Sequence, residues 1–459
     1  MKLKKMVMLA VTGALSFSLL TGCGKGNSDN QAGTDSGTTS ESSTSLNSSS
    51  EPAKDAAKED TSAAGDRKVV MSWWGNQVRN KRTTEALSLF TEQTGIETEG
   101  QFYQWDDYWN KMATSAAGNS LPDIIQMDRS YIAQYVSSGE IIDLTPYIES
   151  GAINTDHIED SVMKTGEVDG KVYGMVAGLS CPCILYNKTL TDSLGIEIKD
   201  NMTIDEFIAI AKEITEKTGY RTNLVASNFW SAWARGEGIP IVEAKAPVDS
   251  YEPYISGFKV LENGIKDGWH LTPDCIDSSA TETDPLVYGS DPATMAWCTN
   301  NGGSNLLTSF QNAAPEGVEL GITTIPTNNP KASNSLGVSQ YFCISSDCKD
   351  VDAAVALIDW LINSEDCNNI LLAERGVPAS SAIAEAISSK MDAPSALGMD
   401  YVVNVIEVNC SPMDPPVPDG YSEISNTMTK LAEAVGYGEM TAEDAAKEYY
   451  DKMIEVWGK

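Results

Sequence analysis

Aromatic and charged side chains gather where apolar, strand-like runs end in the first third of the chain. Trp74 ends one such run and Trp105 follows a second. Asp128 and Arg129 follow a third. An aromatic ring packs on the apolar C–H face of a sugar ring, and carboxylate and guanidinium groups bind its hydroxyls. These four residues therefore indicate a binding site for a polyhydroxylated ring.

Each of these residues also has a purely structural interpretation. Strand alternation sends Trp73 and Trp74 to opposite faces, so we expect Trp74 in a binding cleft and Trp73 in the core. Trp105 could instead be a surface ring at the start of a helix. Asp128 could cap the helix that follows it.

A second set of candidate ligand contacts lies further along the chain and consists of Asn228, Phe229, Trp230, Asn300, Asn301 and Tyr421. The first three follow a strand-like run, and the asparagine pair precedes Gly302-Gly303. This glycine pair lacks the lysine of a phosphate-binding loop. It reads either as a turn with a helix cap or as a backbone contact to ligand.

Other kinds of chemistry have little support in the residue inventory. The chain has two histidines, His157 and His270, and they lack the spacing of metal ligands. So few histidines also give little support to a Ser-His-Asp triad. We expect both histidines at the surface. We predict no catalytic residue, no metal site and no cofactor. Acidic residues are abundant, however, and paired carboxylates hydrolyse glycans. A cell-surface carbohydrate-active enzyme that uses Asp106, Asp107 or Asp128 is therefore an alternative.

The elements that must position these residues follow an alternating rhythm. Strand-like runs cover 69–75, 96–102 and 121–127, with helical patterns between them. Such a βαβαβ order predicts a parallel sheet, in which ligands bind beyond the carboxyl ends of the strands. The predicted contacts stand at those ends.

A second block of strands and helices follows residues 171–190, which we expect to carry the chain from one lobe to another. Asp169-Gly170 predicts a tight hairpin just before this stretch. Thr203 and Glu206 form a capping box for a helix. Residues 336–345 read as a strand that returns to the first lobe, followed by a buried helix over 351–362.

Length and charge narrow the class of protein. The chain has 459 residues, too many for a single core, and a formal net charge of −33. A chain with this much negative charge repels the phosphate backbone, so we do not expect it to bind nucleic acid.

The amino terminus has the features of an export signal. Lys2, Lys4 and Lys5 precede a short apolar run, too short to span a membrane, and Leu20-Thr21-Gly22-Cys23 resembles a bacterial lipobox. We predict a signal peptide over 1–22 and lipidation of Cys23; an ordinary secretory cleavage site is the alternative. Residues 24–66 are small and polar, so 23–66 is predicted to be the lipidated cysteine and a disordered tether.

Several short patches in order resemble the bacterial extracellular solute-binding proteins of family 1, the sugar-binding lipoproteins of ABC importers. The resemblance covers about residues 67–459. Its patches are Met71-Ser72-Trp73-Trp74-Gly75, residues 116–124, Gly139-Glu140-Ile141-Ile142-Asp143-Leu144, Asp169-Gly170-Lys171-Val172-Tyr173-Gly174, Leu185-Tyr186-Asn187-Lys188 and Gly376-Val377-Pro378.

The resemblance implies an α/β fold of the two-lobed, type II periplasmic-binding-protein kind. Each lobe would be a mostly parallel sheet flanked by helices, with hinge crossovers between the lobes. We place the first lobe at 67–180 plus about 335–394, and the second at 181–334 plus about 395–459. Trp74, Asp128 and Arg129 correspond to sugar contacts of the first lobe. The acidic residue that the maltodextrin-binding pattern has near Ser180 is missing, which argues against a malto-oligosaccharide.

The function that the resemblance implies is transport without catalysis. The expected protein is a monomer held on the outer face of the cell membrane by the Cys23 lipid. It would capture a carbohydrate, favoured to be an oligosaccharide by the several aromatic residues, and deliver it to ABC-transporter permease subunits. A binder of a non-sugar solute such as a peptide or polyamine remains a further alternative.

Overall fold

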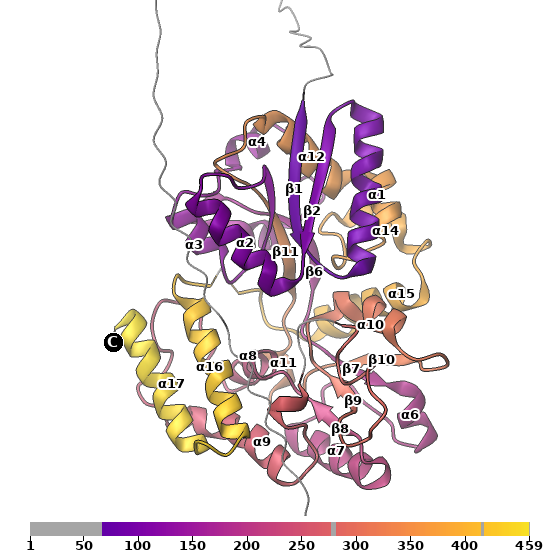
Figure 1. Cartoon of the computed structure of the whole chain (residues 1–459), viewed down its shortest axis with the longest axis vertical. Coiled ribbons are helices and arrows are strands. Elements are labelled where there is room, and N and C mark those ends of the chain that lie inside the picture. Colours follow the sequence, from indigo (N-terminus) through magenta and orange to yellow (C-terminus); the bar gives the residue numbers. More distant parts are fainter. Residues whose placement is uncertain (1–66, 277–280, 415–416, 459) are drawn as a thin grey trace, which may run out of the picture. The chain divides into compact units, whose positions relative to one another are not determined.

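Two β-sheets with flanking helices organise residues 67–276, 281–414 and 417–458, the part of the chain that this computed structural model describes (Figure 1). The predicted signal peptide (1–22), Cys23 and the tether up to residue 66 lie outside the described residues. Among the described helices, none is long and apolar enough to cross a membrane.

The first sheet contains five strands in the order β2-β1-β3-β11-β6. Their bounds are β1 (Lys68–Trp74), β2 (Glu97–Tyr103), β3 (Ile124–Met127), β6 (Met175–Ser180) and β11 (Gly337–Ile344). β1 pairs in parallel with β2 and β3, whereas β11 runs antiparallel to β3 and β6. The predicted βαβαβ block and the returning strand are both confirmed.

The strands β1 and β2 end level with each other at the edge of this sheet, where Trp74 lies opposite Tyr103. Along β1 the side chains of Val69, Met71 and Trp73 are buried in the core, whereas Trp74 is only partly buried. This is the alternation that a strand requires. It separates the two neighbouring indole rings, as the sequence predicts.

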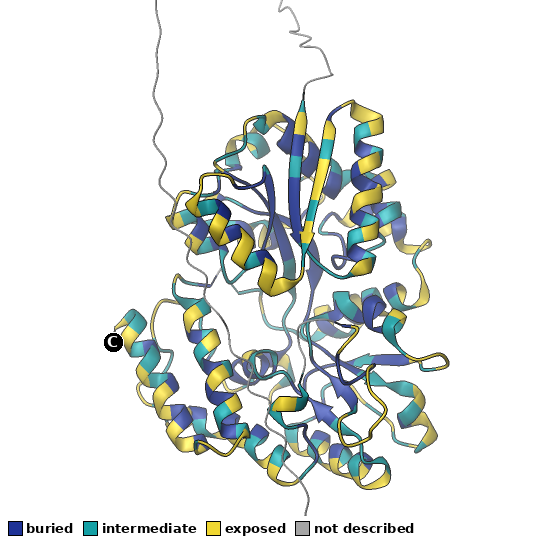
Figure 2. Cartoon of the chain, viewed as in Figure 1, coloured by how far each residue is buried: buried dark blue, intermediate teal, exposed yellow. Residues whose placement is uncertain are grey.

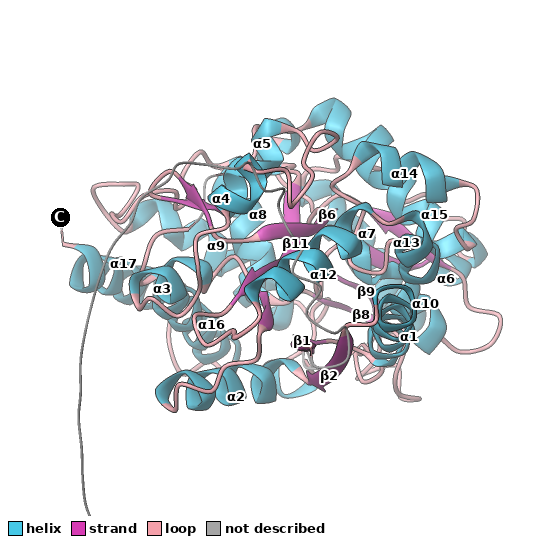
Figure 3. Cartoon of the chain, turned by 90° about the horizontal axis from the view of Figure 1, so that it is seen from above, coloured by secondary structure: helices cyan, strands magenta, loops and turns pink. Residues whose placement is uncertain are grey.

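Helices flank the strands of this sheet, as the view from above shows (Figure 3). They are α1 (Gln77–Thr94), α2 (Trp105–Ala117), α3 (Ile132–Ser137), α4 (Thr145–Glu149), α5 (Asp160–Met163), α12 (Val351–Asn363), α13 (Glu365–Leu371) and α14 (Ser381–Ser388). The helix predicted over 351–362 is α12, and most of its side chains are buried.

The second sheet has the order β10-β7-β9-β8. Its strands are β7 (Ile184–Asn187), β8 (Arg221–Asn223), β9 (Ala296–Thr299) and β10 (Leu320–Thr323). β8 and β9 pair in parallel, and β7 is antiparallel to its neighbours β9 and β10.

The helices that follow β6 in the chain and pack around this second sheet are α6 (Lys188–Ser193), α7 (Ile204–Thr218), α8 (Ala226–Gly236), α9 (Glu252–Lys266), α10 (Leu307–Ala313), α11 (Pro330–Ser333), α15 (Ala393–Asp400), α16 (Tyr421–Gly436) and α17 (Ala442–Trp457). The predicted capping box is present, because Thr203 and Glu206 satisfy each other's backbone N–H groups at the start of α7. The predicted hairpin is also present: β4 (Glu167–Val168) and β5 (Lys171–Val172) are joined by Asp169 and Gly170, both at positive φ.

One strand in each sheet runs in the opposite direction to the other strands, so each sheet is mixed rather than uniformly parallel. In the first sheet it is β11, and in the second it is β7. Each is the strand that the chain forms just after it passes from one sheet to the other. A strand that begins at the crossing runs away from it, whereas the other strands end near it.

The buried apolar side chains form two clusters, and residues of both sheets are buried (Figure 2). The second cluster is rich in large rings, which include Phe229, Trp230, Trp233, Tyr254 and Tyr449. Burying side chains of this size stabilises a fold by roughly 1.5–3 kcal/mol each. The first cluster also takes in Leu307, Phe310 and Tyr401. These three residues lie outside the ranges that we predicted for the first lobe. The lobe boundaries therefore stay a prediction.

Candidate ligand-binding cleft

A polar cleft lies where the strand ends of the two sheets face each other. It consists of two adjoining cavities of about 320 and 570 Å³. Both cavities are lined by Asp128, Asn228, Ser231, Gly302, Gly303, Asn305 and Ser339. The smaller one reaches the segments that pass between the sheets, at Ser180–Pro182 and Ser335–Ser339.

Aromatic rings form the first-sheet wall of the larger cavity. The ring of Trp74 lies edge-on to that of Trp105, with 5.0 Å between their centroids, and both line the cavity. Tyr131 lines it too and stacks on Trp109 at 3.9 Å. Trp105 is 36% exposed, whereas Trp73 is fully buried. The wall therefore offers flat apolar faces of the kind that sugar rings pack on.

Asp128 and Arg129 follow β3 and lie at the same edge. The Oδ1 atom of Asp128 accepts a hydrogen bond from the backbone N–H of Ser130 at 2.8 Å. The cap of α3 is Tyr131, so Asp128 stabilises a turn before the helix rather than capping it. Burial raises the pKa of Asp128 above its usual value.

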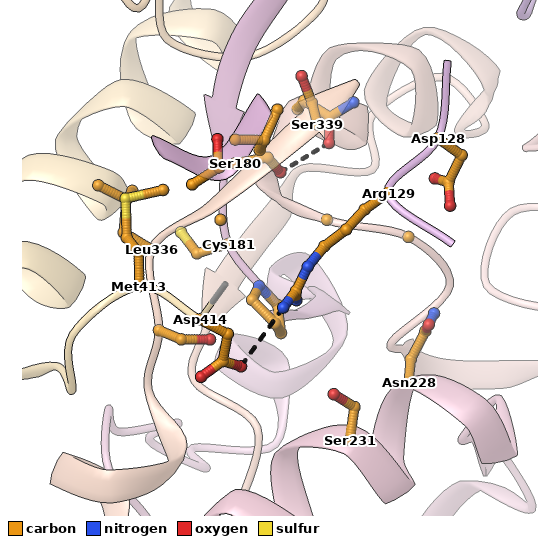
Figure 4. Close-up of a pocket in the computed structure, with 18 of the residues that line it drawn as sticks. Asp128, Arg129, Ser180, Cys181, Asn228, Ser231, Leu336, Ser339, Met413 and Asp414 are labelled. Carbon is orange, nitrogen blue, oxygen red and sulfur yellow. Dashed lines mark hydrogen bonds and ion pairs between the residues drawn. The ribbon is translucent and has the colours of Figure 1, made fainter. Parts of the chain in front are cut away.

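Amide and hydroxyl groups form the opposite wall. Asn228 and Ser231 project from α8, and Asn301 and Asn305 come from the loop after β9 (Figure 4 labels the first two). The Nδ2 atom of Asn228 donates to the carbonyl oxygen of Asn300 at 2.9 Å. Such side chains supply the directional hydrogen bonds that a ring of hydroxyls needs.

A buried carboxylate lies beneath this wall and orients Asn301. The Oδ2 atom of Asp284 accepts hydrogen bonds at 3.1 Å from Asn301, Asn223 and Thr299. Burial raises the pKa of Asp284 from 3.8 to about 6. Because the amide nitrogen of Asn301 donates to Asp284, the side-chain carbonyl oxygen of Asn301 is the acceptor that remains for a ligand in the cleft.

Three residues predicted as ligand contacts do not line either cavity of the cleft. Phe229 and Trp230 are buried in the second core, and Trp230 borders only a separate small cavity of about 40 Å³. The predicted loop is in fact helix α8. A helix turns its residues 229, 230 and 233 to one face and 228 and 231 to another.

Asn300 is the third of these residues, and it too is buried. Its side chain is used within the protein, since Oδ1 accepts from the N–H of Val225 at 2.6 Å and Nδ2 donates to the carbonyl of Val225 at 3.2 Å. It fixes the start of α8 instead of facing the cleft. His270 is also buried rather than at the surface, and burial lowers its pKa to about 4.

Tyr421 lies at the wall of the larger cavity, as the first residue of α16. Burial raises the pKa of its hydroxyl, which therefore stays protonated and can donate. Trp74, Trp105, Asp128, Asn228 and Asn301 line the same cavity, and Arg129 lines the smaller one.

Gly302 and Gly303 let the loop after β9 approach the crossing segment. Gly302 has φ +84°, and a Cβ on Gly303 would lie 2.4 Å from the Oγ atom of Ser180. The backbone N–H of Ser304 donates to the carbonyl of Cys181 at 3.0 Å. Both glycines line the cleft and also precede a short helical turn, so the two interpretations of the pair are compatible.

Several cleft residues carry no sequence signal of their own. Among them are Ser180, Ser231, Arg235, Asn305, Ser339 and Asp414. Asp414 stands in a proline-rich connector and meets Arg235 only through the fold. For Ser180 and Ser339 an indirect signal existed, because each lies next to a predicted crossing between the lobes and such crossings border the cleft.

Comparison with known proteins identifies the family. A family model described as bacterial extracellular solute-binding protein matches residues 85–395, more than half of the chain. The chain belongs to this family.

Two relatives of this solute-binding protein are named for sugars or polyols. An erythritol/L-threitol-binding protein of Mycolicibacterium smegmatis is 27% identical over 164 residues, which cover 32% of this chain and 34% of that protein. The match thus spans only about a third of that relative. A galactooligosaccharide-binding protein of Bacillus subtilis is 21% identical over 352 residues, 72% of this chain and 77% of that protein.

A solved structure shows the same fold. The periplasmic oligogalacturonide-binding protein from Yersinia enterocolitica, in complex with saturated digalacturonic acid, has a TM-score of 0.74 and 20% identity. The comparison covers 86% of this chain and 100% of that one. The solute-binding fold expected from the sequence is therefore confirmed.

Proposed function

We propose that this solute-binding protein captures a carbohydrate, favoured to be an oligosaccharide, in the cleft between its two sheets and delivers it to an ABC importer. The observation that carries the proposal is the pairing of the two walls. The partly buried ring of Trp74 and the exposed ring of Trp105 line the same cavity as the amide and hydroxyl side chains of Asn228, Ser231 and Asn301. One wall fits the apolar faces of sugar rings, and the other fits their hydroxyls.

The length of the cleft supports more than one sugar unit. The larger cavity adjoins the smaller, and together they run from the rings near Trp105 to the crossing segments at Ser180 and Leu336. The names of the relatives, which bind a polyol and a galactooligosaccharide, agree with a hydroxylated ligand.

The mechanism that we propose is capture without chemistry. A ligand that touches both walls binds the closed arrangement of the lobes better than the open one, and so shifts the population toward closure. The permease would then recognise the closed form.

A thermal-shift screen tests the function. Purified protein comprising residues 67–459 is melted with and without each member of a panel of mono- and oligosaccharides, amino acids, peptides and polyamines. A bound ligand raises the melting temperature by mass action, and we expect glycans alone to do so. A rise with peptides or polyamines and none with glycans would overturn the proposal.

The same incubation separates a carrier from an enzyme. The glycan that gives the shift is recovered after prolonged contact with the protein and analysed by mass spectrometry. We expect it unchanged. A shortened glycan would mean that the carbohydrate-active enzyme is the correct interpretation.

We also propose that Cys23 carries the lipid anchor and that residues 24–66 tether the binding unit outside the cell as a monomer. The basis is the lipobox-like sequence and the polar composition of the tether. Metabolic labelling with an alkyne-tagged palmitate should mark the wild type. Cys23→Ser should lose the label and release the protein into the medium; a labelled Cys23→Ser variant would contradict the anchor.

A further inference from the structure

The charged side chains that line the cleft balance one another. Its guanidinium groups belong to Arg79, Arg129 and Arg235. Its carboxylates belong to Asp128, Glu282 and Asp414. In a protein whose formal net charge is −33, this balance is a local property of the cleft.

Each of the three guanidinium groups is already engaged by a carboxylate of the protein. The Nε atom of Arg79 donates to both carboxylate oxygens of Glu374 at 2.9 Å. Arg235 donates to Asp414, and the Nη2 atom of Arg129 lies 3.8 Å from the Oδ2 atom of Asp414. Figure 4 shows the side chain of Arg129 extending toward Asp414.

Asp414 is thus shared between two cations that come from distant parts of the chain. Arg129 follows β3 in the first sheet, and Arg235 ends α8 beside the second. The side chain of Arg235 is only 7% exposed and that of Asp414 20%, so their pairing is weakly screened by solvent. Arg235 is held further by Ser411 and by the carbonyl oxygen of Pro412.

We propose that the cleft selects uncharged glycans over acidic ones, and that Asp414 is the residue that sets this selectivity by neutralising Arg129 and Arg235. The inference rests on the proposed function and deepens it by naming the class of sugar.

The physical reason is competition for the same guanidinium groups. A uronate carboxylate would seek Arg129 or Arg235, because bidentate pairing with a guanidinium is the strongest contact available to it. The Oδ2 atom of Asp414 already lies against both guanidinium groups. Both carboxylates would then lie close together in a poorly solvated site, where like charges repel strongly.

A neutral sugar meets no such conflict. Its hydroxyls both donate and accept, so they can bond to the remaining lone pairs of Asp414 without breaking the ion pair. The raised pKa of Asp128, caused by burial, also indicates that this end of the cleft disfavours added negative charge.

The test compares matched pairs of glycans by titration calorimetry at pH 7 and low salt. Neutral di- and trisaccharides of galactose, glucose and mannose are each paired with the same glycan oxidised to the uronate at C6. We expect every neutral glycan that binds to do so at least about tenfold more tightly than its uronate. A uronate that binds as tightly as its neutral partner, or more tightly, would overturn the inference and leave the proposed function standing. If no member of either set is bound, the inference and the carbohydrate function fall together.

Variants of Asp414 then test its role. Asp414→Asn removes the carboxylate that the two guanidinium groups share, so the preference for the neutral glycan should shrink to about threefold or less, or invert. Asp414→Glu keeps the charge and should keep the preference. Asp192→Asn is the matched control, since it removes one negative charge from an exposed pair with Lys188. It should leave the preference as in the wild type.

If the Asp414→Asn variant retains the tenfold preference, Asp414 does not set the selectivity. If that variant does not melt cooperatively, the titration of the wild type and of Asp414→Glu decides: loss of the preference in Asp414→Glu contradicts the inference.

Discussion

The two walls of the cleft use the same kind of sequence in opposite ways. Trp73-Trp74 and Phe229-Trp230 are both aromatic pairs that come at or just after the end of a strand. In the first pair one ring, that of Trp74, faces the cleft. In the second pair both rings pack into the core.

The difference follows from the local backbone. Trp73 and Trp74 belong to a strand, whose alternation sends successive side chains to opposite faces. Phe229 and Trp230 belong to a helix, which brings them to the same side as Trp233. An aromatic pair is therefore a signal for a cleft ring only where the backbone is extended. On the helical wall the shorter residues Asn228 and Ser231 line the cleft instead.

Truncating the two neighbouring indoles one at a time should show the largest difference between them. Trp73→Ala removes a fully buried ring and should destabilise the protein by about 3–5 kcal/mol, with the affinity of the folded fraction unchanged. Trp74→Ala should weaken ligand binding by roughly 2 kcal/mol, about thirtyfold, and cost less stability. Urea unfolding and titration of the glycan found in the screen measure the two effects. An equal loss of stability in both variants would mean that Trp74 belongs to the core.

A second prediction concerns the carboxylate under the amide wall. The folded-state pKa of Asp284 is about 6 and its usual value is 3.8, so the folded protein binds this proton more tightly than the unfolded chain. Its contribution to stability is therefore full below about pH 4 and is lost as the pH rises through 6, a change of roughly 3 kcal/mol.

Urea unfolding of the wild type and of Asp284→Asn at pH 4, 5, 6 and 7 measures this effect. The difference in unfolding free energy, wild type minus variant, should fall across that range and then level off. A difference that does not change with pH would contradict the role of Asp284.

A third prediction tests the inward packing of the helical rings. Gly257 lies on α9, and a Cβ there would sit 2.7 Å from the ring of Trp230 and 3.0 Å from that of Trp233. Gly257→Ala should therefore overpack the second core and destabilise the protein by about 1–3 kcal/mol, despite the better helix propensity of alanine. Thermal unfolding measures the loss, and ligand affinity should stay the same. A gain in stability would show that the core has room at this position.

The smallest expected effect separates the two neighbouring asparagines. Asn301→Ala removes an amide that lines the cleft and should weaken glycan binding by about 1 kcal/mol, or roughly fivefold. Asn300→Ala removes a buried clamp on Val225, so it should lower stability by a similar amount and spare affinity. Titration and unfolding of both variants test the pair. The reverse pattern would mean that Asn300, and not Asn301, contacts the ligand.

Reading the sequence located most of the framework but only part of the site. The strands that end at Trp74 and Met127, the hairpin at Asp169-Gly170 and the capping box of α7 were all predictable, because each depends on neighbours a few residues away. The start of α8 was missed, since a short strand leads directly into it and no side chain caps it. Because the helix was interpreted as a loop, Phe229 and Trp230 were wrongly included in the predicted site.

The order of the elements, their hydrophobic periods and the turn chemistry were determined by the sequence itself, since contacts within a few residues set them. The charge pairing within the cleft was decided by the tertiary structure. Arg129, Arg235 and Asp414 stand far apart in the chain and acquire a shared charge balance only when the two sheets bring them together. No local pattern encodes such a meeting, because it depends on where whole strands and helices come to rest.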